Sequence, residues 1–183
     1  MWHEPQSISP KRAVVMRVFA RYASYGFSLT YWESCALCAL MQAGGLSLGL
    51  TFEPGPRGLG SQGVIRVLEH LEGVCFEGFL AHKLDRPFVV DDFALRQGRL
   101  VLKAHKQHRE FVLTMAKVLH GFESPMGLWL LSSCWWLLVE EQMPWPRVRE
   151  ALSNPRPTQG IVANPEHLDA AHDRLHEMSL LFD

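Results

Sequence analysis

The stretch Ser124-Pro-Met-Gly-Leu-Trp-Leu-Leu-Ser-Ser-Cys-Trp-Trp-Leu-Leu-Val139 decides the fold class. Ser124 is a natural N-cap and Pro125 a natural first helical residue, because the amide that proline lacks would have no partner in the first turn. The helix that follows is apolar on all sides, which is typical of a helix buried at the centre of a domain. Its apolar run is shorter than the roughly 18 residues that a membrane span needs. We therefore predict a mainly helical domain built around this segment.

Apolar residues at helical spacing predict further helices on both sides of this segment. One of them has a clear start, because Thr30 and Glu33 stand in the capping-box relation, and Gly44-Gly45 ends it. The last begins with Asn164-Pro165, which repeats the combination of a cap and a proline. The predicted helices cover residues 13–22, 30–43, 62–72, 111–122 and 164–182.

Short alternating segments predict a small β-ribbon beside the helices. Residues 46–52 alternate with the two-residue period of a strand, and the glycines and prolines of 53–60 predict a loop. The ribbon itself is predicted over residues 74–79, 88–93 and 99–103, with Gln97-Gly98 turning the last pair. A helix followed by a hairpin is the outline of a winged helix-turn-helix. The predicted fold class is a mainly α domain with a small β-ribbon, similar to a winged helix-turn-helix.

Length and composition indicate one globular domain. The chain has 183 residues, of which 48% are hydrophobic and 20% charged, and its net charge is −1. Such a chain can bury a sizeable core without disulfides or a structural metal. The first residues offer neither the apolar core of a signal peptide nor an Arg-rich transit pattern. We predict a single cytoplasmic domain over residues 1–183, with a flexible N-terminal arm over residues 1–12.

The sequence lacks the motifs that would indicate an enzyme. It contains no nucleophile elbow, P-loop, dinucleotide fingerprint or zinc-protease helix motif. Cys35 and Cys38 have no second ligand pair at zinc spacing, and the four cysteines are expected to be buried thiols. Two histidine pairs at helical spacing lack a third ligand, namely His105 with His108 and His172 with His176. We predict no catalytic residue, no metal and no cofactor, and a protein that works by binding a partner.

The near-neutral net charge hides a strong charge asymmetry. Acids dominate residues 69–92, whereas residues 93–109 contain bases and no acids. The basic stretch could contact the phosphates of a nucleic acid, and the acidic stretch could enter a basic cleft of another protein. The two stretches could also pair with each other across the ribbon. The residues by themselves leave all three interpretations open.

Three segments resemble the C-terminal domain of the DarG antitoxins, and together they span most of the chain. They are Cys38-Ala-Leu-Met-Gln-Ala-Gly-Gly-Leu-Ser-Leu-Gly-Leu-Thr-Phe52 with Gly55-Pro56 after it, Val67-Leu-Glu-His-Leu-Glu-Gly73 with Gly78 after it, and Gly121-Phe-Glu-Ser-Pro-Met-Gly-Leu-Trp-Leu-Leu-Ser-Ser133. In that family an N-terminal macrodomain removes ADP-ribose from DNA, and the C-terminal domain binds the DarT toxin, a DNA ADP-ribosyltransferase. The resemblance implies inhibition of a DarT-like partner by contact in its single-stranded-DNA groove, and it implies no hydrolase activity.

The chain departs from this family at one exposed position. Where the family usually reads Gly-Pro-Tyr, the sequence has Gly55-Pro56-Arg57, so a cation replaces an aromatic ring. A proline-stiffened loop loses little entropy when a partner binds it, which favours a contact role for this segment. The predicted partner-binding residues are Phe52, Glu53, Pro56, Arg57, Glu69, Glu72, Asp91 and Asp92. In the alternative, a winged-helix DNA-binding transcriptional regulator, the nucleic acid contacts Arg96, Arg99, Lys103, Lys106 and Arg109.

Overall fold

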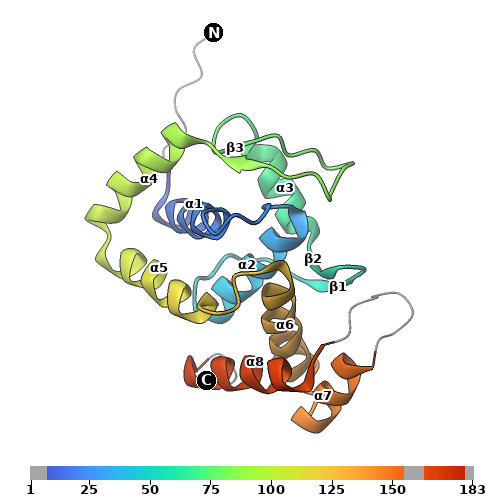
Figure 1. Cartoon of the computed structure of the whole chain (residues 1–183). Helices are drawn as coiled ribbons and strands as arrows, with labels where there is room; N and C mark the ends of the chain where they lie inside the picture. Colours follow the sequence, from blue (N-terminus) through green and yellow to red (C-terminus); the bar gives the residue numbers. More distant parts are fainter. Residues whose placement is uncertain (1–7, 155–162, 180–183) are drawn as a thin grey trace.

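A long apolar helix packs between the other helices of the chain in a computed structural model (Figure 1). The structure describes residues 8–154 and 163–179. The central helix, α6 (Pro125–Trp135), continues as a π-helix, η1 (Trp136–Glu140). The other helices in the described ranges are α1 (Pro10–Ala23), α2 (Tyr31–Ala43), α3 (Gln62–Leu71), α4 (Asp92–Ala104), α5 (Lys106–Leu119), α7 (Trp145–Ser153) and α8 (Pro165–Glu177).

The start of α6 follows from its sequence. The side chain of Ser124 accepts a hydrogen bond from the amide of Gly127 at 3.0 Å. Gly127 has no room for a side chain, because a Cβ there would lie 2.6 Å from the carbonyl oxygen of Phe122. Leu131 and Cys134 are fully buried, and the helix packs against α2 and α8. The prediction of a central buried helix is confirmed.

Other predicted helix starts are confirmed by their caps. Thr30 and Glu33 form the capping box of α2, in which Glu33 accepts a hydrogen bond from the amide of Thr30 at 2.9 Å. Asn164 caps α8 and accepts a hydrogen bond from the amide of Glu166 at 3.0 Å. Both caps satisfy amides that would otherwise lack a partner in the first turn.

The N-terminal helix begins earlier than predicted. Ser9 caps α1, and Pro10 is its first residue. The predicted flexible arm over residues 1–12 is therefore wrong for residues 10–12, which are helical. Residues 1–7 of that arm lie outside the described ranges.

The β-structure is smaller than predicted and partly elsewhere. β1 (Glu53–Gly55) pairs antiparallel with β2 (Gly58–Gly60), so the segment predicted as a loop is a hairpin. Residues 46–52, predicted as a strand, are irregular. The side-chain amide of Gln42 donates a hydrogen bond to the carbonyl oxygen of Leu50 at 2.9 Å and accepts one from its backbone amide at 3.0 Å. These bonds take the place of the bonds to a partner strand. β3 (Phe76–Glu77) pairs antiparallel with β4 (Val89–Val90), inside two of the predicted ribbon segments.

The third predicted ribbon strand, residues 99–103, belongs to α4 instead. The side chain of Asp91 caps this helix and accepts a hydrogen bond from the amide of Ala94 at 2.6 Å. Ala94, Gly98 and Leu102 recur at helical spacing and are buried, and α4 packs against α1. Gly98 is a close-packing position and not a turn, since a Cβ there would lie 3.0 Å from the methyl group of Met16. The mainly helical class with small β-ribbons is confirmed, and the predicted last strand of the wing is wrong.

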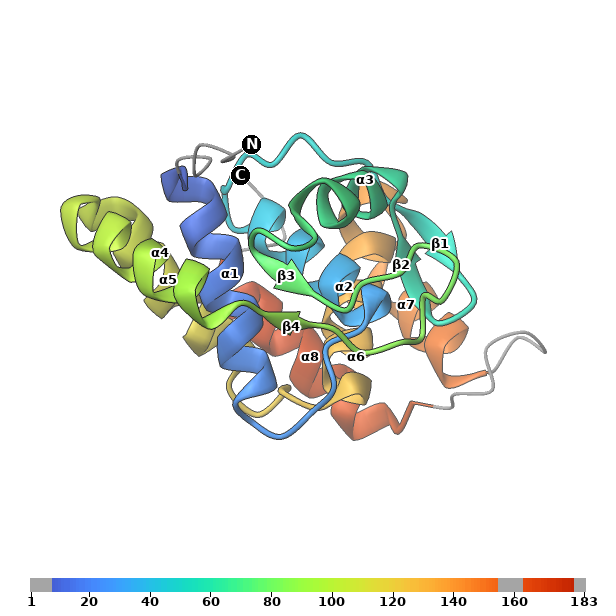
Figure 2. The ribbon, with the colours of Figure 1, turned by 90° about the horizontal axis from the view of Figure 1, so that it is seen from above.

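The helices leave two edges of the molecule far apart. α1, α4 and α5 pack together on one side, and the β1–β2 hairpin lies on the other side in both views (Figures 1 and 2). α2 and α6 lie between these edges and pack on each other. Among the described residues, no helix combines the length and the apolarity that a membrane crossing needs.

Candidate protein-binding surface

The β1–β2 hairpin lies against two tryptophans from different helices. A Cβ on Gly55 would approach the ring of Trp32 to 3.0 Å, and a Cβ on Gly58 would approach the ring of Trp129 to 3.3 Å. Gly58 also has a φ of +128°, which side-chain-bearing residues rarely adopt. The turn between the two glycines is Pro56-Arg57, and both of its residues are exposed. Glycine at these positions therefore lets the hairpin pack closely and present its turn to solvent.

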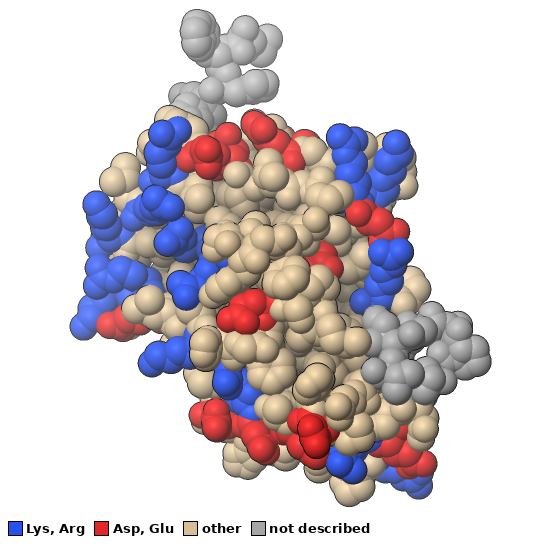
Figure 3. Space-filling view, in the orientation of Figure 1, with Lys and Arg blue, Asp and Glu red and all other residues tan. Residues whose placement is uncertain are grey.

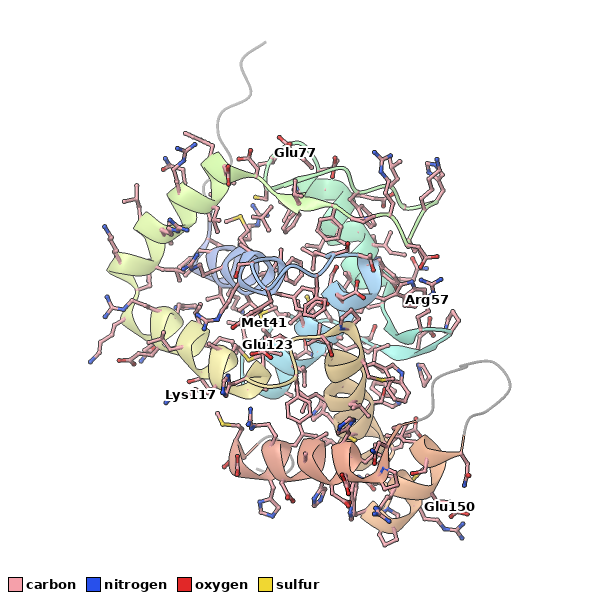
Figure 4. The ribbon with its side chains drawn as sticks, in the orientation of Figure 1. Met41, Arg57, Glu77, Lys117, Glu123 and Glu150 are labelled. Carbon is pink, nitrogen blue, oxygen red and sulfur yellow. The ribbon has the colours of Figure 1, made fainter. Side chains whose placement is uncertain are left out.

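Asp85 ties the hairpin to the body of the protein. Its Oδ1 atom accepts a hydrogen bond from the indole Nε1 of Trp32 at 2.9 Å and lies 2.8 Å from Nη1 of Arg57. The side chains of Arg57 and Asp85 are 62% and 60% exposed, so this ion pair adds little to stability. It does hold the guanidinium at the outer end of the hairpin, where Figure 4 labels Arg57. An arginine that is ordered before binding loses less conformational entropy on contact with a partner.

A tyrosine anchors the other end of the hairpin. The phenol oxygen of Tyr31 accepts a hydrogen bond from the amide of Ser61 at 2.6 Å, directly after β2. Burial raises the pKa of Tyr31, and the neighbouring charges of Cys35 and Glu53 add to that rise. The Tyr31 hydroxyl is therefore neutral at physiological pH and acts as a fixed hydrogen-bonding group beneath the hairpin.

Two acidic residues of the predicted surface, the exposed Glu72 and the partly buried Asp91, have structural hydrogen bonds. Glu72 accepts hydrogen bonds from the amides of Gly78 and Phe79 at 2.7 and 3.0 Å, and Asp91 caps α4. These carboxylates hold the chain that enters and leaves the β3–β4 ribbon. The remaining carboxylates around this ribbon are exposed, and we call them the acidic edge: Glu69, Glu77 and Asp92.

The hairpin and the acidic edge lie at opposite ends of α3. Ser61 follows β2 and caps the start of this helix, whereas Glu69 lies near its end. Its ten residues rise by about 15 Å. Phe52 and Glu53 accompany the hairpin, since Phe52 is half-buried against the core and Glu53 pairs with Gly60. The predicted surface is therefore two patches separated by the length of a helix.

The predicted nucleic-acid residues gather on a third surface. Arg96, Arg99, Lys103, Lys106 and Arg109 are all exposed, on α4 and at the start of α5, where Lys and Arg cluster in Figure 3. They are helical and not part of a wing. No ion pair within residues 8–154 and 163–179 joins the acidic stretch to this basic stretch. Within these ranges no ion pair supports the pairing of the two stretches, while the exposure of most of their charged side chains agrees with solvated faces.

The cysteines and histidines singled out by spacing have structural surroundings. All four cysteines are buried, and burial raises the pKa of Cys35 and of Cys134 to about 12. Such thiols are protonated at neutral pH and react slowly. His172 stacks on Trp145 with ring centroids 4.2 Å apart. In the part of the chain that the structure describes, no group of three or more His, Cys, Asp or Glu could hold a metal ion.

Sequence reasoning missed the residues that position the hairpin. Trp32 and Trp129 lie inside helices whose apolar pattern explains them as core residues, so no signal marked them as hairpin contacts. Asp85 was counted among the acids of its stretch but was not assigned to the hairpin. It lies 53 residues from Trp32 in the sequence, and no periodicity relates positions that far apart.

Comparison with known proteins gives one distant relative. No family model matches the chain. A curated protein of Thermus aquaticus named DNA ADP-ribosyl glycohydrolase is 28% identical over 169 residues, which are 92% of this chain and 47% of that protein. The chain thus spans about half the length of the relative that it matches. The name of this relative describes the removal of ADP-ribose from DNA, which is the activity of the macrodomain in the DarG family described above. The match is consistent with a DarG-related protein.

The match also corrects a prediction. We predicted that the chain is not an enzyme and has no active site and no hydrolase activity, whereas its relative is named as an enzyme. The prediction that the chain is no enzyme is therefore contradicted. Over nearly its whole length, the chain is similar to part of a DNA ADP-ribosyl glycohydrolase.

Proposed function

We propose that this chain binds a DarT-like DNA ADP-ribosyltransferase and neutralises it by direct contact. The observation that carries the proposal is the β1–β2 hairpin, which Trp32 and Asp85 hold with Arg57 exposed at its turn. The similarity to a DNA ADP-ribosyl glycohydrolase supports a setting in which DNA ADP-ribosylation is controlled. The hairpin and the acidic edge would form the two contact patches.

The hairpin has the properties of an interface anchor. Arginine is enriched among the residues that dominate binding energy, and an ordered guanidinium offers five donors in a fixed geometry. A small cavity of about 110 Å³ lies beside the hairpin, lined by Leu59, Trp129 and Trp136 among others. It has room for one apolar side chain of a partner. A cation at the hairpin turn and an apolar cavity along the same hairpin are features that a folded protein surface can complement together.

The acidic edge supports the mimicry of a DNA strand. An enzyme that acts on DNA attracts phosphates with a positively charged groove. Exposed carboxylates can occupy such a groove where phosphates would lie, and complementary charge also speeds association. Because the acidic edge lies a helix length from the hairpin, the proposal requires a partner groove that spans both patches.

The proposal is tested by co-purification and by an enzyme assay. The chain would be co-expressed with a DarT-like toxin, and the initial rate of DNA ADP-ribosylation would be measured with increasing amounts of the chain. We expect a stable complex and a rate that falls in proportion to the complex formed. A toxin that keeps its full rate in the presence of excess folded chain would contradict the proposal.

A matched pair of variants tests the role of the hairpin. Arg57→Glu reverses the charge at the hairpin turn, and Arg147→Glu makes the same change in the exposed ion pair of Arg147 with Glu150 on α7. We expect the first variant to weaken inhibition at least about ten-fold, as the loss of one central arginine does, and the second to leave it unchanged. Equal effects of the two variants would remove the hairpin from the proposal.

A separate assay distinguishes contact from hydrolysis. DNA that already carries ADP-ribose would be incubated with the chain alone, and the release of ADP-ribose would be followed. Inhibition by contact lowers the rate at which new modification appears and leaves existing modification in place. If the chain removes existing ADP-ribose at a rate that accounts for the protection, the contact mechanism is wrong.

A further inference from the structure

A cluster of cations covers the side of the molecule that faces away from the hairpin. We call it the basic corner; it consists of Arg17, Arg96, Arg99, Lys103, Lys106 and Arg109, from α1, α4 and α5. In Figure 3, Lys and Arg side chains gather over the ribbons of α4 and α5, and both ribbon views place these helices at the edge opposite the hairpin. Its function is independent of the contact patches proposed above.

Most of these cations form no ion pair within the described ranges. Among the ion pairs within the described ranges, only Lys106 of the basic corner takes part, with Glu110 at 3.7 Å. The first turn of α5 contains no acidic residue, so the positive end of that helix adds to the field of the side chains. Burial and the nearby charges of Arg99 and Arg21 lower the pKa of Arg17. Apart from Lys106, the cations of this surface therefore present positive charge that no ion pair within the described residues neutralises.

Exposed apolar side chains alternate with the cations along α4. Phe93, Arg96, Leu100 and Lys103 recur every three or four residues on the face opposite to the buried face of the helix. Phe93 is 63% exposed and Leu100 is 56% exposed. Phe93 and Arg96 lie one turn apart on this face, and an exposed aromatic ring next to cations is the arrangement with which proteins stack a base beside a bound phosphate.

We propose that the basic corner binds single-stranded nucleic acid. Arg96, Lys103 and their neighbours hold successive phosphates, and the ring of Phe93 stacks on a base. A duplex would offer phosphates but no unstacked base for that ring, so the apolar stripe favours a single strand. An acidic protein segment would satisfy the charges, but only a nucleic acid strand carries a planar base beside each negative charge.

The proposal is tested with a labelled 12-nucleotide oligothymidine, an oligouridine of the same length and a duplex of the same length. The affinity of the intact chain for each would be measured by fluorescence anisotropy as salt is raised. If four cations meet phosphates, binding of the single strand weakens by about 50-fold between 50 and 200 mM salt. Preference for either single strand over the duplex supports the proposal, and the comparison of the two strands says whether DNA or RNA is favoured.

Variants test whether oligonucleotide binding depends on the basic corner or on positive charge anywhere on the protein. Arg96→Ala with Lys103→Ala should weaken binding at least about ten-fold and reduce the salt slope by about 1.4. Phe93→Ala should weaken it about five-fold or more without changing the slope. The matched control is Lys83→Ala with Arg86→Ala, which removes two exposed cations from the segment between β3 and β4 and should change affinity by no more than about two-fold.

Several outcomes would overturn the proposal. One is a folded chain that binds none of the three oligonucleotides at 50 mM salt, and another is tighter binding to the duplex than to either single strand. If the double variant binds oligonucleotide normally but loses the toxin in co-purification, the basic corner is a surface for an acidic protein. Intact toxin inhibition by that variant, together with lost oligonucleotide binding, would confirm that the two functions are separate.

Discussion

The hairpin and the basic corner both expose arginines, but the surroundings of these arginines differ. Arg57 is held by Asp85, which the indole of Trp32 fixes in turn. On α4, Arg96 and Arg99 extend from a regular helix and have no ion pair in the described ranges. A charged group held by a fixed partner presents its hydrogen-bond donors in a defined orientation, whereas charged groups without ion-pair partners attract a ligand over a long range. The first arrangement suits one shaped partner, and the second suits a repeating polyanion.

The two regions also depend differently on the core. Trp129 supports the hairpin from α6 and is buried, whereas the side chain of Phe93 on α4 is largely exposed. A substitution in the core should therefore also alter the structure of the hairpin, whereas a substitution on the outer face of α4 should affect only that face. The predictions below begin with the largest expected effect.

The largest expected effect is on the rate at which the cysteine thiols are labelled, which reports on the buried body of the protein and not on the basic corner. All four cysteines are buried, and none lies between residues 91 and 120, which hold most of the basic corner. At pH 8 we expect labelling at least about a thousand-fold slower than in denaturant, because a buried, protonated thiol reacts only after the body opens. Labelling of the native protein at the denatured rate would show that the core around these cysteines is not closed.

Trp129→Ala should destabilise the protein by about 3 to 5 kcal/mol, because it leaves a cavity under the hairpin. Phe93→Ala is the control and should change the free energy of unfolding by less than about 0.5 kcal/mol. Urea denaturation followed by circular dichroism measures both. Similar losses in the two variants would contradict the view that only the hairpin depends on the core.

Stability should fall as the pH rises above 8. Burial raises the pKa of the Cys35, Cys38 and Cys134 thiols above the ordinary value of 9.0, so the folded protein keeps protons that the unfolded chain releases. Stability falls wherever the folded state binds more protons. Between pH 8 and 9.5 the loss should be about 1 kcal/mol for each of the three thiols.

Serine variants provide the check on this pH dependence. Cys134→Ser removes one of the titrating groups, so its stability should fall less steeply over the same pH range, whatever its stability at pH 7. An unchanged slope in the variant would assign the effect to other groups, such as the buried tyrosines.

Asp85→Ala should destabilise the protein by only about 1 kcal/mol, because an exposed ion pair and one exposed hydrogen bond are lost. The variant should instead make the hairpin more mobile. Hydrogen exchange of the hairpin amides should therefore accelerate, while exchange in α4 stays unchanged. A double-mutant cycle with Arg57→Ala measures the coupling. A coupling energy near zero would mean that Asp85 does not orient Arg57.

Much of the fold was predictable because its signals are local. Thr30 with Glu33 and Ser124 with Pro125 act within one helical turn, and each satisfies amides a few residues away. The prediction failed over residues 99–103, where Gly98 resembled a turn residue. In the structure Gly98 faces Ala13 and Met16 of α1, and only that close packing explains why the position is a glycine within a helix.

The residues proposed for the candidate surface come from the sequence, whereas their arrangement comes from the structure. Arg57 was singled out where the chain departs from the family that it resembles, yet its partner Asp85 follows from no spacing rule. Glu69 and the hairpin are close in sequence, but α3 holds them a helix length apart.

The sequence by itself determined where α2, α6 and α8 begin, which helix is central and which stretches are charged, because caps and periodicity depend on residues within one or two turns. Only the tertiary structure decided that Trp32, Arg57 and Asp85 meet, that the acidic edge stands apart from the hairpin, and that the cations of α1, α4 and α5 share one corner. These contacts join residues far apart in the chain, and the packing of buried side chains sets their distances.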